Sequence, residues 1–419
     1  MISGYKKFFT LLSFILFSSI FFTIEVNADQ VYFVSPSGND SATGGKDDPW
    51  QTIQHAINQV QAGDTINVRK GIYKELITIE DIGDIKQGWL TIQGYKDEIP
   101  IIDGSTIEVK GSKRAGFSLK QAEGIRIQNF EIRNIKTDDE NRYPAGILIS
   151  NASQHIELNN NNIHHIANYA EDGNAHGIIV YGNKAKAIEH IVIKNNKLHD
   201  LTLGRSESLT LSGNVTQFTI DQNYIYDNNN IGIDIAGHYG ACDEDNCMDI
   251  ARNGMVSNNR VIRNSSAKNP AYDGDNSAAG IYVDGGQHIA VVNNIVSENN
   301  FGISISSENY EKAAINITVE RNIIINNDKS GLVIGGADHD NGGAHHSQIR
   351  KNIFIKNDLS NEGYREILVQ HHNINNTFSN NIYYLCNRKD YLYSSDDTNP
   401  QNEFKNEIFR FSNNLCTKN

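Results

Sequence analysis

Apolar and polar residues alternate along most of this chain in short runs, and the runs are of two kinds. One kind has the form I-x-I-x-x-N-x-[IVL], as in IELNNNNI, IVIKNNKL and FTIDQNYI. The other kind begins with glycine, as in GILIS, GIIVY, GIDIA and GIYVD. Since successive side chains of a strand point to opposite faces, this period of two predicts β-strands rather than helices.

The asparagine of the first kind of run recurs about every 30 residues, which predicts a solenoid. No helical crossover fits between the runs, so we expect a coil of short parallel strands stacked about 4.8 Å apart. Stacked amides can bond to the backbone and to one another, and asparagine tolerates the left-handed conformation of a turn. The recurring positions are Asn161, Asn196, Asn223, Asn259, Asn294, Asn322, Asn352 and Asn381.

Inward Ile, Leu and Val side chains form a long, thin core, and its two ends require caps. Residues 52–60 predict a short amphipathic helix at the N-terminal end, with Trp50, Ile53 and Ile57 on its buried side. The C-terminal segment is expected to close the other end. The predicted units are residues 1–28, a β-helix domain at 29–385 and a C-terminal cap at 386–419.

The stretch from Tyr32 to Glu75, YFVSPSGNDSATGGKDDPWQTIQHAINQVQAGDTINVRKGIYKE, resembles the opening of secreted proteins of the pectate-lyase-like superfamily. With the repeats, the resemblance covers nearly all of the chain after residue 28. It implies an all-β fold, a single-stranded right-handed parallel β-helix, and an activity among uronan lyases, alginate-acting enzymes and glycosidases. The acidic DDGWD-type and DPHD motifs of two such families are absent, so the resemblance assigns no catalytic residue.

The first 28 residues are typical of a signal peptide. Lys6 and Lys7 precede an apolar run from Phe8 to Ile24, and residues 26–28 end in a small-residue cleavage pattern. A transmembrane anchor is the alternative, but serine and threonine interrupt the run, and spanning requires about 20 predominantly apolar residues. We therefore expect a secreted or periplasmic protein, with no membrane span after cleavage.

The chain is acidic, with a formal net charge of −13 at pH 7. This balance argues against a nucleic-acid partner, because phosphate binding relies on clustered Lys and Arg. An anionic substrate would need local basic residues or a bound cation. We expect a polysaccharide substrate and a monomeric protein.

Four cysteines fit an oxidising compartment. Local pairing predicts one disulfide between Cys242 and Cys247 and another between Cys386 and Cys416. A zinc site is the alternative, but the CxxxxC spacing has no matching pair nearby.

The glycine-initiated strands expose their third and fifth residues on the outer face of the coil. Carboxylates then occur on only two consecutive coils, as Asp234 and Asp284. Tyr282 is expected beside Asp234 at about 4.8 Å, with Asp284 on the diagonal at about 7 to 8 Å. The outward pairs in stacking order are Leu148 and Ser150, Ile179 and Tyr181, Thr210 and Ser212, Asp234 and Ala236, Tyr282 and Asp284, Ser304 and Ser306, and Val333 and Gly335.

Long polar insertions precede and follow these strands, which predicts a cleft above them. An outward aspartate on a solvated strand is ordinary; two of them between the longest insertions indicate a catalytic site. The predicted catalytic residues are Asp234, Asp284, Tyr282, His238 and Arg252. The predicted substrate-binding residues are Tyr181, Ser304, Ser306, Glu308 and His176.

The oxygen-rich segment DGDN makes Asp273 and Asp275 candidate ligands of Ca²⁺, because hard cations take several carboxylate and carbonyl oxygens. It lacks the spacing of an EF-hand. The histidine-rich GGADHDNGGAHH is better interpreted as a solvated loop than as a metal site.

Three functions fit this surface. The first is a lyase that cleaves a uronic-acid polysaccharide by β-elimination, with Ca²⁺ neutralising the substrate carboxylate and a loop residue as base. The second is a glycoside hydrolase that uses Asp234 and Asp284 as its two carboxyl groups. The third is a glycan-binding surface or matrix protein, although few aromatic residues are available for sugar stacking.

Overall fold

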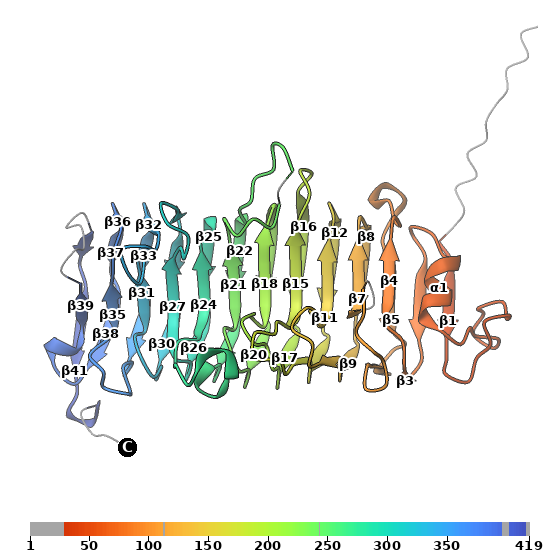
Figure 1. The fold of residues 1–419 in the computed structure, drawn as a ribbon, viewed down its shortest axis with the longest axis horizontal. Coiled ribbons are helices and arrows are strands. Elements are labelled where there is room, and N and C mark those ends of the chain that lie inside the picture. Colours follow the sequence, from red (N-terminus) through yellow and green to blue (C-terminus); the bar gives the residue numbers. More distant parts are fainter. Residues whose placement is uncertain (1–28, 112–113, 243, 396–401, 416–419) are drawn as a thin grey trace, which may run out of the picture.

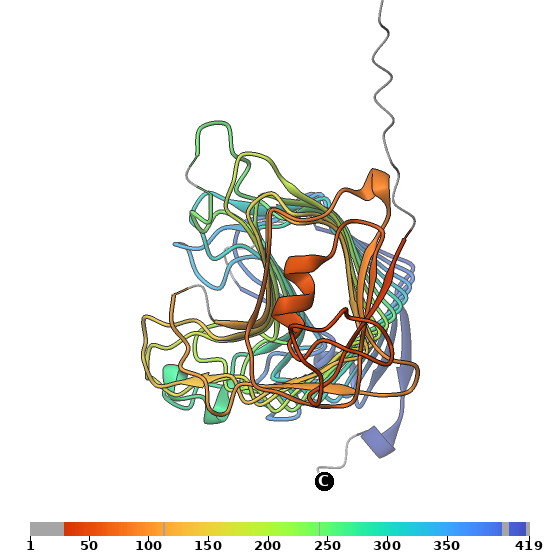
Figure 2. The same cartoon turned by 90° about the vertical axis from the view of Figure 1, so that its right-hand side faces the viewer.

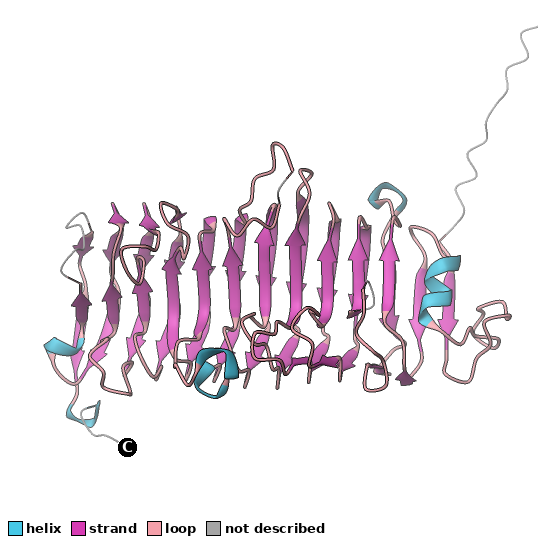
Figure 3. Cartoon of the chain, viewed as in Figure 1, coloured by secondary structure: helices cyan, strands magenta, loops and turns pink. Residues whose placement is uncertain are grey.

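A computed structural model describes residues 29–111, 114–242, 244–395 and 402–415. The chain winds into a long solenoid of parallel strands (Figures 1 and 3), which confirms the predicted parallel β-helix. The predicted signal peptide lies outside the described residues. Within the described residues, no helix is long and apolar enough to cross a membrane.

Each coil contributes one strand to each of three parallel sheets, in the order sheet 1, sheet 2, sheet 3. Sheet 1 contains β1 (Val31–Val34), β2 (Thr65–Val68), β5 (Leu90–Gly94), β8 (Glu123–Gln128), β12 (Gln154–Asn159), β16 (Ile188–Lys194), β19 (Val215–Asp221), β22 (Arg252–Ser257), β25 (Gln287–Val292), β29 (Thr318–Glu320), β33 (Gln348–Arg350), β37 (Thr377–Ser379) and β40 (Glu403–Lys405), flanked by β28 (Ala313–Ile315), β32 (Gly343–His345) and β36 (Asn373–Ile374). Sheet 2 contains β3 (Gly71–Tyr73), β6 (Pro100–Asp103), β9 (Glu131–Arg133), β13 (Asn162–His164), β17 (Lys197–His199), β20 (Tyr224–Tyr226), β23 (Arg260–Ile262), β26 (Ile295–Ser297), β30 (Ile323–Ile325), β34 (Ile353–Ile355), β38 (Ile382–Leu385) and β41 (Ile408–Phe411).

Sheet 3 is built from the glycine-initiated runs and carries the candidate site. It contains β4 (Ile77–Glu80), β7 (Ala115–Lys120), β11 (Ala145–Ser150), β15 (His176–Gly182), β18 (Leu209–Gly213), β21 (Ile233–Ala236), β24 (Ala279–Asp284), β27 (Phe301–Ser306), β31 (Leu332–Ile334), β35 (Ile367–Val369) and β39 (Leu392–Ser394). The short strands β10 (Lys136–Thr137) and β14 (Ala167–Asn168) pair with each other outside these sheets.

The interior of the solenoid is a continuous stack of aliphatic side chains. Ile147, Ile178, Leu209, Ile233 and Ile281 are fully buried on five successive strands of sheet 3. Each such side chain contributes about 1.5 to 3 kcal/mol through burial. This packing fixes the register between coils, because a shift by one residue would turn every apolar side chain outward.

The recurring asparagines form a buried ladder at the turn between sheets 1 and 2. The Asn259 Oδ1 accepts from the backbone N–H of Asn223 at 2.9 Å and from its Nδ2 at 3.0 Å. Its own Nδ2 donates to the carbonyl of Ile220 and to Asn294 Oδ1. Amide stacking is thus confirmed. The predicted backbone conformation was wrong by one position: the residue before the ladder asparagine has the positive φ, as in Asn258 with φ 55°.

A second ladder, which the repeat pattern did not predict, runs along the next turn, between sheets 2 and 3. It consists of Asn228, Asn264, Asn299, Asn327 and Asn357. Its last member, Asn357, donates from its backbone N–H and its Nδ2 to the two oxygens of the Glu366 carboxyl group. The first ladder ends in the same way, since Asn381 Nδ2 donates to Glu407. A carboxyl group therefore supplies the acceptors that a further asparagine would provide.

The N-terminal end is closed by α1 (Ile53–Gln59), which lies across the opening of the coils in Figure 2. Thr52 is its N-cap, and Trp50, Ile53 and Ile57 are buried as predicted. The predicted C-terminal cap is, in its described residues, a further coil: β39, β40 and β41 extend all three sheets. The same alternation of apolar residues continues there, so the strand pattern does not stop at residue 385.

Five short 3₁₀ helices interrupt the connections of the described chain: η1 (Ile85–Gln87), η2 (Ser266–Lys268), η3 (Pro270–Tyr272), η4 (Arg388–Asp390) and η5 (Asn413–Leu415). The loop between β21 and β22 and the segment holding η2 and η3 project from opposite edges of sheet 3 (Figures 1 and 2).

Candidate functional site

The outer face of sheet 3 has the register that the repeat predicts. Asp234 pairs with Thr210 on one side and with Tyr282 on the other, and Asp284 pairs with Ala236 and Ser306. Side chains that point outward here are nevertheless buried: Asp234 is 5% and Asp284 3% exposed. The loops at both edges therefore cover the face on which these carboxyl groups stand.

Asp234 lies at the centre of this face. Its Oδ1 is buried and accepts no hydrogen bond from the described residues. On the preceding coil, the Thr210 hydroxyl donates to Glu207 Oε2 at 2.9 Å and lies 3.1 Å from His176 Nδ1. Because the Thr210 hydroxyl uses its hydrogen in the bond to Glu207, it accepts a hydrogen bond from His176 Nδ1–H. The imidazole, the hydroxyl and the carboxyl group therefore form one hydrogen-bonded chain.

Asp284 lies on the following coil and has two donors. The backbone N–H of Glu308 donates to Asp284 Oδ1 at 2.9 Å, and the Tyr239 hydroxyl contacts Asp284 Oδ2. The same hydroxyl lies 2.9 Å from Glu308 Oε2. Tyr239 thus links two carboxyl groups, Asp284 and Glu308.

The electrostatics of the site favour protonated carboxyl groups. Burial raises the pKa of Glu207 to about 7 and that of Asp284 to about 8, with the charge of Glu308 adding to both. Burial raises the pKa of Asp234 well above its usual range, and the charges of Glu207 and Asp284 raise it further. In the described part of the chain, no Lys or Arg forms an ion pair with any of the four. The four carboxyl groups, called the carboxyl cluster below, are Glu207, Asp234, Asp284 and Glu308.

Two cavities flank the carboxyl cluster along the sheet. One, of about 270 Å³, is lined by Tyr282, Ser304, Ser306 and Glu308 on the C-terminal side. The other, of about 370 Å³, lies over β11 and β15 on the N-terminal side, and its lining includes His176 and Tyr181. All the residues predicted to bind substrate therefore line one cavity or the other.

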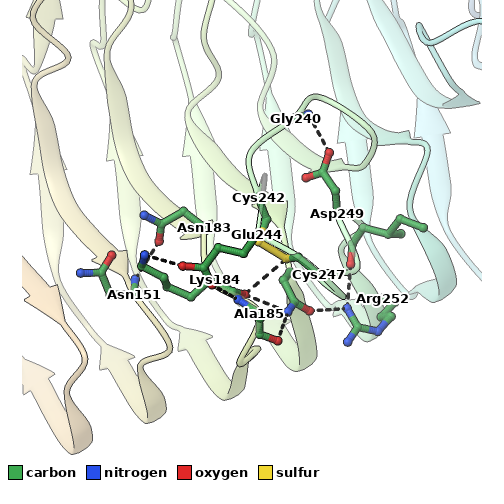
Figure 4. Close-up of a disulfide and its surroundings, with 12 residues drawn as sticks. Asn151, Asn183, Lys184, Ala185, Gly240, Cys242, Glu244, Cys247, Asp249 and Arg252 are labelled. Carbon is green, nitrogen blue, oxygen red and sulfur yellow. Dashed lines mark hydrogen bonds and ion pairs between the residues drawn. A yellow bond between two sulfur atoms is a disulfide. The ribbon is translucent and has the colours of Figure 1, made fainter.

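The loop between β21 and β22 forms one wall of the site. The predicted disulfide between Cys242 and Cys247 is present in it, whereas Cys416 of the second predicted pair lies outside the described residues. Glu244 holds the loop against the turn after β15, through Lys184 Nζ at 2.6 Å and the Ala185 N–H at 2.7 Å (Figure 4). This attachment positions Tyr239, which belongs to the same loop.

Two predicted catalytic residues, Arg252 and His238, form no hydrogen bond to the carboxyl cluster among the described residues. Arg252 begins β22 in sheet 1 and donates to Asn214 Oδ1 and to the carbonyl of Ile250 (Figure 4). His238 follows β21 with φ 74°, and its backbone N–H donates to the carbonyl of Asp249. The chemistry proposed below uses neither side chain, although His238 Nε2 is buried without a hydrogen bond from the described residues, and both catalytic roles stay predictions.

The two candidate calcium ligands are exposed. Asp275 forms an ion pair with Lys329 at 3.7 Å, and Asp273 has a left-handed backbone with φ 48°. Over the residues described, no group of three or more His, Cys, Asp or Glu side chains is arranged to hold a metal ion. The donors present here do not form a calcium site with Asp234 and Asp284, and calcium stays a prediction.

The sequence analysis did not identify Glu207, Tyr239 or Arg114, the last of which lines the N-terminal cavity. Glu207 precedes Leu209 by two residues, as His176 precedes Ile178, and Ile178 pairs with Leu209. Glu207 was therefore identifiable as the residue next to His176 at the same corner of successive coils. Tyr239 and Arg114 lie outside the alternating strands, where no periodicity indicates a direction.

Comparison with known proteins agrees with this architecture. A family model described as a Pel9A-like, right-handed β-helix region matches residues 32–200, and a second right-handed β-helix model matches residues 145–341. The uncharacterized protein YwoF of Bacillus subtilis is 34% identical over 358 residues, which cover 85% of this chain and 75% of YwoF. Pectate lyase PEL9 of Emericella nidulans is 39% identical over 77 residues, 18% of each chain.

Solved structures share the fold at low identity. A GH136 lacto-N-biosidase from Eubacterium ramulus superposes with a TM-score of 0.58 at 12% identity, covering 91% of this chain and 68% of the enzyme. A glycoside hydrolase superposes with a TM-score of 0.57 at 10% identity, covering 93% and 98%. At these sequence identities, the structural similarity concerns the backbone fold alone and does not identify a reaction.

Proposed function

Because the chain belongs to the right-handed parallel β-helix family that includes YwoF of Bacillus subtilis, we propose that it is an exported enzyme that hydrolyses glycosidic bonds of a polysaccharide. The observation that supports this most is the carboxyl cluster. Glycoside hydrolysis requires one carboxylic acid that donates a proton and a second carboxylate that activates water or attacks carbon. The outer face of sheet 3 brings such groups together on consecutive coils.

Asp234 is the general acid of the proposal. Its buried position beside three other carboxyl groups raises its pKa well above the usual range, which favours the protonated form that can give its proton to the departing sugar oxygen. Asp284 is the base. Burial raises its pKa to about 8, but the hydrogen bonds from the Glu308 N–H and the Tyr239 hydroxyl favour the ionised form, so we propose that Asp284 gives up its proton before Asp234 does. Two like groups in different surroundings thus take opposite roles.

The register also predicts the stereochemical course. Asp234 and Asp284 stand one strand and two residues apart, which corresponds to about 8 Å between their Cβ atoms. This value lies in the range of about 6.5 to 9.5 Å that leaves room for a water molecule and gives inversion. We therefore expect the released sugar to have the opposite anomeric configuration, which proton NMR of the early product can measure.

The lyase hypothesis is less well supported by the same geometry. β-Elimination needs the substrate carboxylate neutralised and a base beside the acidic C–H. The described cluster consists of four carboxyl groups and has no paired Lys or Arg, so it offers no positive charge to neutralise a uronate placed directly over it. The sequence identity with pectate lyase PEL9 is confined to a short part of the chain.

A panel of soluble neutral and acidic polysaccharides tests the proposal. Each is assayed for new reducing ends and, separately, for the ultraviolet absorbance of an unsaturated sugar product, with and without excess EDTA. A hydrolase yields reducing ends without absorbance, and we expect EDTA to leave its rate unchanged. Absorbance together with reducing ends would overturn the proposal in favour of a lyase, and retained binding without either product would favour a glycan-binding protein.

A further inference from the structure

The N-terminal cavity beside the carboxyl cluster is lined by a cation. Arg114 lies immediately before β7 and lines the cavity together with Tyr143 and Tyr181. In the part of the chain that the structure describes, no carboxylate forms an ion pair with it. A guanidinium stays charged in proteins, so this position carries a positive charge in a protein of net charge −13.

The floor of this cavity is apolar. Leu148 faces outward on β11 beside Ile179 of β15, and Leu148 with Ala145 and Ala115 forms a small cluster separate from the core. On either side the same stack carries polar residues, Ser118 before and Thr210 after. Flat apolar surface next to tyrosines suits the C–H face of a sugar ring.

The cavity is coupled to the proposed catalytic groups. His176 lines it and also contacts Thr210, whose hydroxyl donates to Glu207 of the carboxyl cluster. Burial lowers the pKa of His176 to about 4, with the charge of Arg114 contributing, so the imidazole is neutral and Arg114 is the cation that a ligand meets. Ile179 on the cavity floor lies two strands from Asp234, about 10 Å along the sheet, so one polysaccharide chain can reach both places.

We propose that this cavity is a subsite for a pyranose that carries an anionic substituent, a carboxylate or a sulfate, and that Arg114 selects it. The inference rests on the proposed function and adds the substrate class. The two parts of one substrate then occupy different places: the scissile bond lies over the carboxyl cluster, and the charged sugar lies about 10 Å along the sheet, paired with the guanidinium. Arg114 can form a forked pair of hydrogen bonds with either anion.

Binding to an inactive enzyme tests the subsite independently of catalysis. Calorimetry with the Asp234→Asn variant uses trisaccharides of uronic acids, the same trisaccharides after reduction of their carboxyl groups, and a sulfated trisaccharide. We expect an acidic trisaccharide to bind and its reduced form to bind more weakly. Adding Arg114→Met should weaken binding of the acidic form by about 10- to 100-fold and leave the reduced form unchanged, because one charge-assisted contact is lost.

Arg260→Met is the matched control, since Arg260 lies on β23 of sheet 2 over the Tyr224 ring and its loss removes the same charge. It should change neither affinity. Arg114→Lys should restore part of the affinity for the acidic form. Equal losses for the acidic and reduced trisaccharides, or no loss with Arg114→Met, would overturn the subsite. Binding and cleavage of neutral sugars alone would also overturn it while leaving the proposed hydrolase standing.

Discussion

Two kinds of polar stack run along this solenoid. The register between coils gives the side chains of one kind their hydrogen-bond partners, and it places groups of like charge side by side in the other. In the asparagine ladders each amide offers a donor and an acceptor, so every rung bonds to the next. In the carboxyl cluster, the stacked groups are all acceptors when ionised, so neighbours repel. Asp234 accordingly has an oxygen without a donor from the described residues, whereas Asn259 has all its amide atoms bonded.

The difference shows how a functional site can be built on a repeated fold. Buried polar groups contribute to stability only when their partners match, and an unmatched group costs about 1 to 3 kcal/mol. The ladders therefore stabilise the fold, whereas the carboxyl cluster lowers the free energy of unfolding. Such a cost is typical of sites where raised pKa values serve acid–base chemistry. Variants of the two stacks should consequently act on different observables.

The largest effect is expected in the carboxyl cluster. Asp234→Asn removes the proposed proton donor and should lower kcat by about 10² to 10⁴-fold. The midpoint of thermal unfolding at neutral pH should stay the same or rise, because the amide removes the cost of burying a carboxyl group whose pKa is raised. Asp81→Asn, an exposed aspartate with φ 54°, is the control and should alter neither quantity. Retained activity in Asp234→Asn would refute its role.

The ladder should respond in the opposite way. Asn259→Ala leaves the Asn223 N–H and amide without their acceptor and the Ile220 carbonyl without its donor. We expect the free energy of unfolding to fall by about 2 to 5 kcal/mol, measured by urea denaturation, with kcat per folded molecule unchanged. Asn258→Gly, next to it on the surface with φ 55°, should lose much less. Equal losses at the two positions would show that the ladder bonds contribute little.

A smaller effect separates the members of the cluster. The charge of Glu207 raises the pKa of Asp234, so Glu207→Gln should lower that pKa. The alkaline limb of kcat/KM, where the acid loses its proton, should then move to lower pH. Glu298→Gln, an exposed carboxylate near the end of β26, should leave the profile in place. A limb that does not move in Glu207→Gln would mean that Asp234 is not the group that limits activity at high pH.

The smallest expected effect is at the end of the second ladder. Burial raises the pKa of Glu366 from 4.5 to about 8. The folded state then binds more protons than the unfolded state, so this contribution to stability is complete below about pH 4.5 and is lost as pH rises to about 8. Glu366→Gln, which keeps an acceptor for Asn357, should flatten the fall of the unfolding free energy over this window. An unchanged slope, measured by denaturation at several pH values, would contradict the shift.

Sequence alone was sufficient for the repeated part of the molecule. Alternating Ile and Val positions and the ladder asparagines follow a rule that each coil repeats, so the outward neighbours of Asp234 follow from the spacing of the runs. Glu207 lies at a corner, Tyr239 on a disulfide-bonded loop and Arg114 ahead of its strand. Glu207 could have been placed from its spacing relative to His176, whereas the direction of Tyr239 depends on contacts such as Glu244 with Lys184, which no periodicity encodes. The second ladder also follows a fixed spacing, because each of its asparagines lies five residues after one of the first ladder, as Asn264 does after Asn259; the run I-x-I-x-x-N-x-[IVL] ends before this position.

Successive rungs of the first ladder are separated by 27 to 36 residues, although each rung bonds to the next in the same way. All of the length difference is therefore placed at the corners, outside the stacked strands. A gene for such a protein can gain or lose several codons at one corner and leave the position of every interior isoleucine as it was. Selection can thus remodel the walls above the sheet, and with them the sugar that is accepted, without having to find a new way to fold.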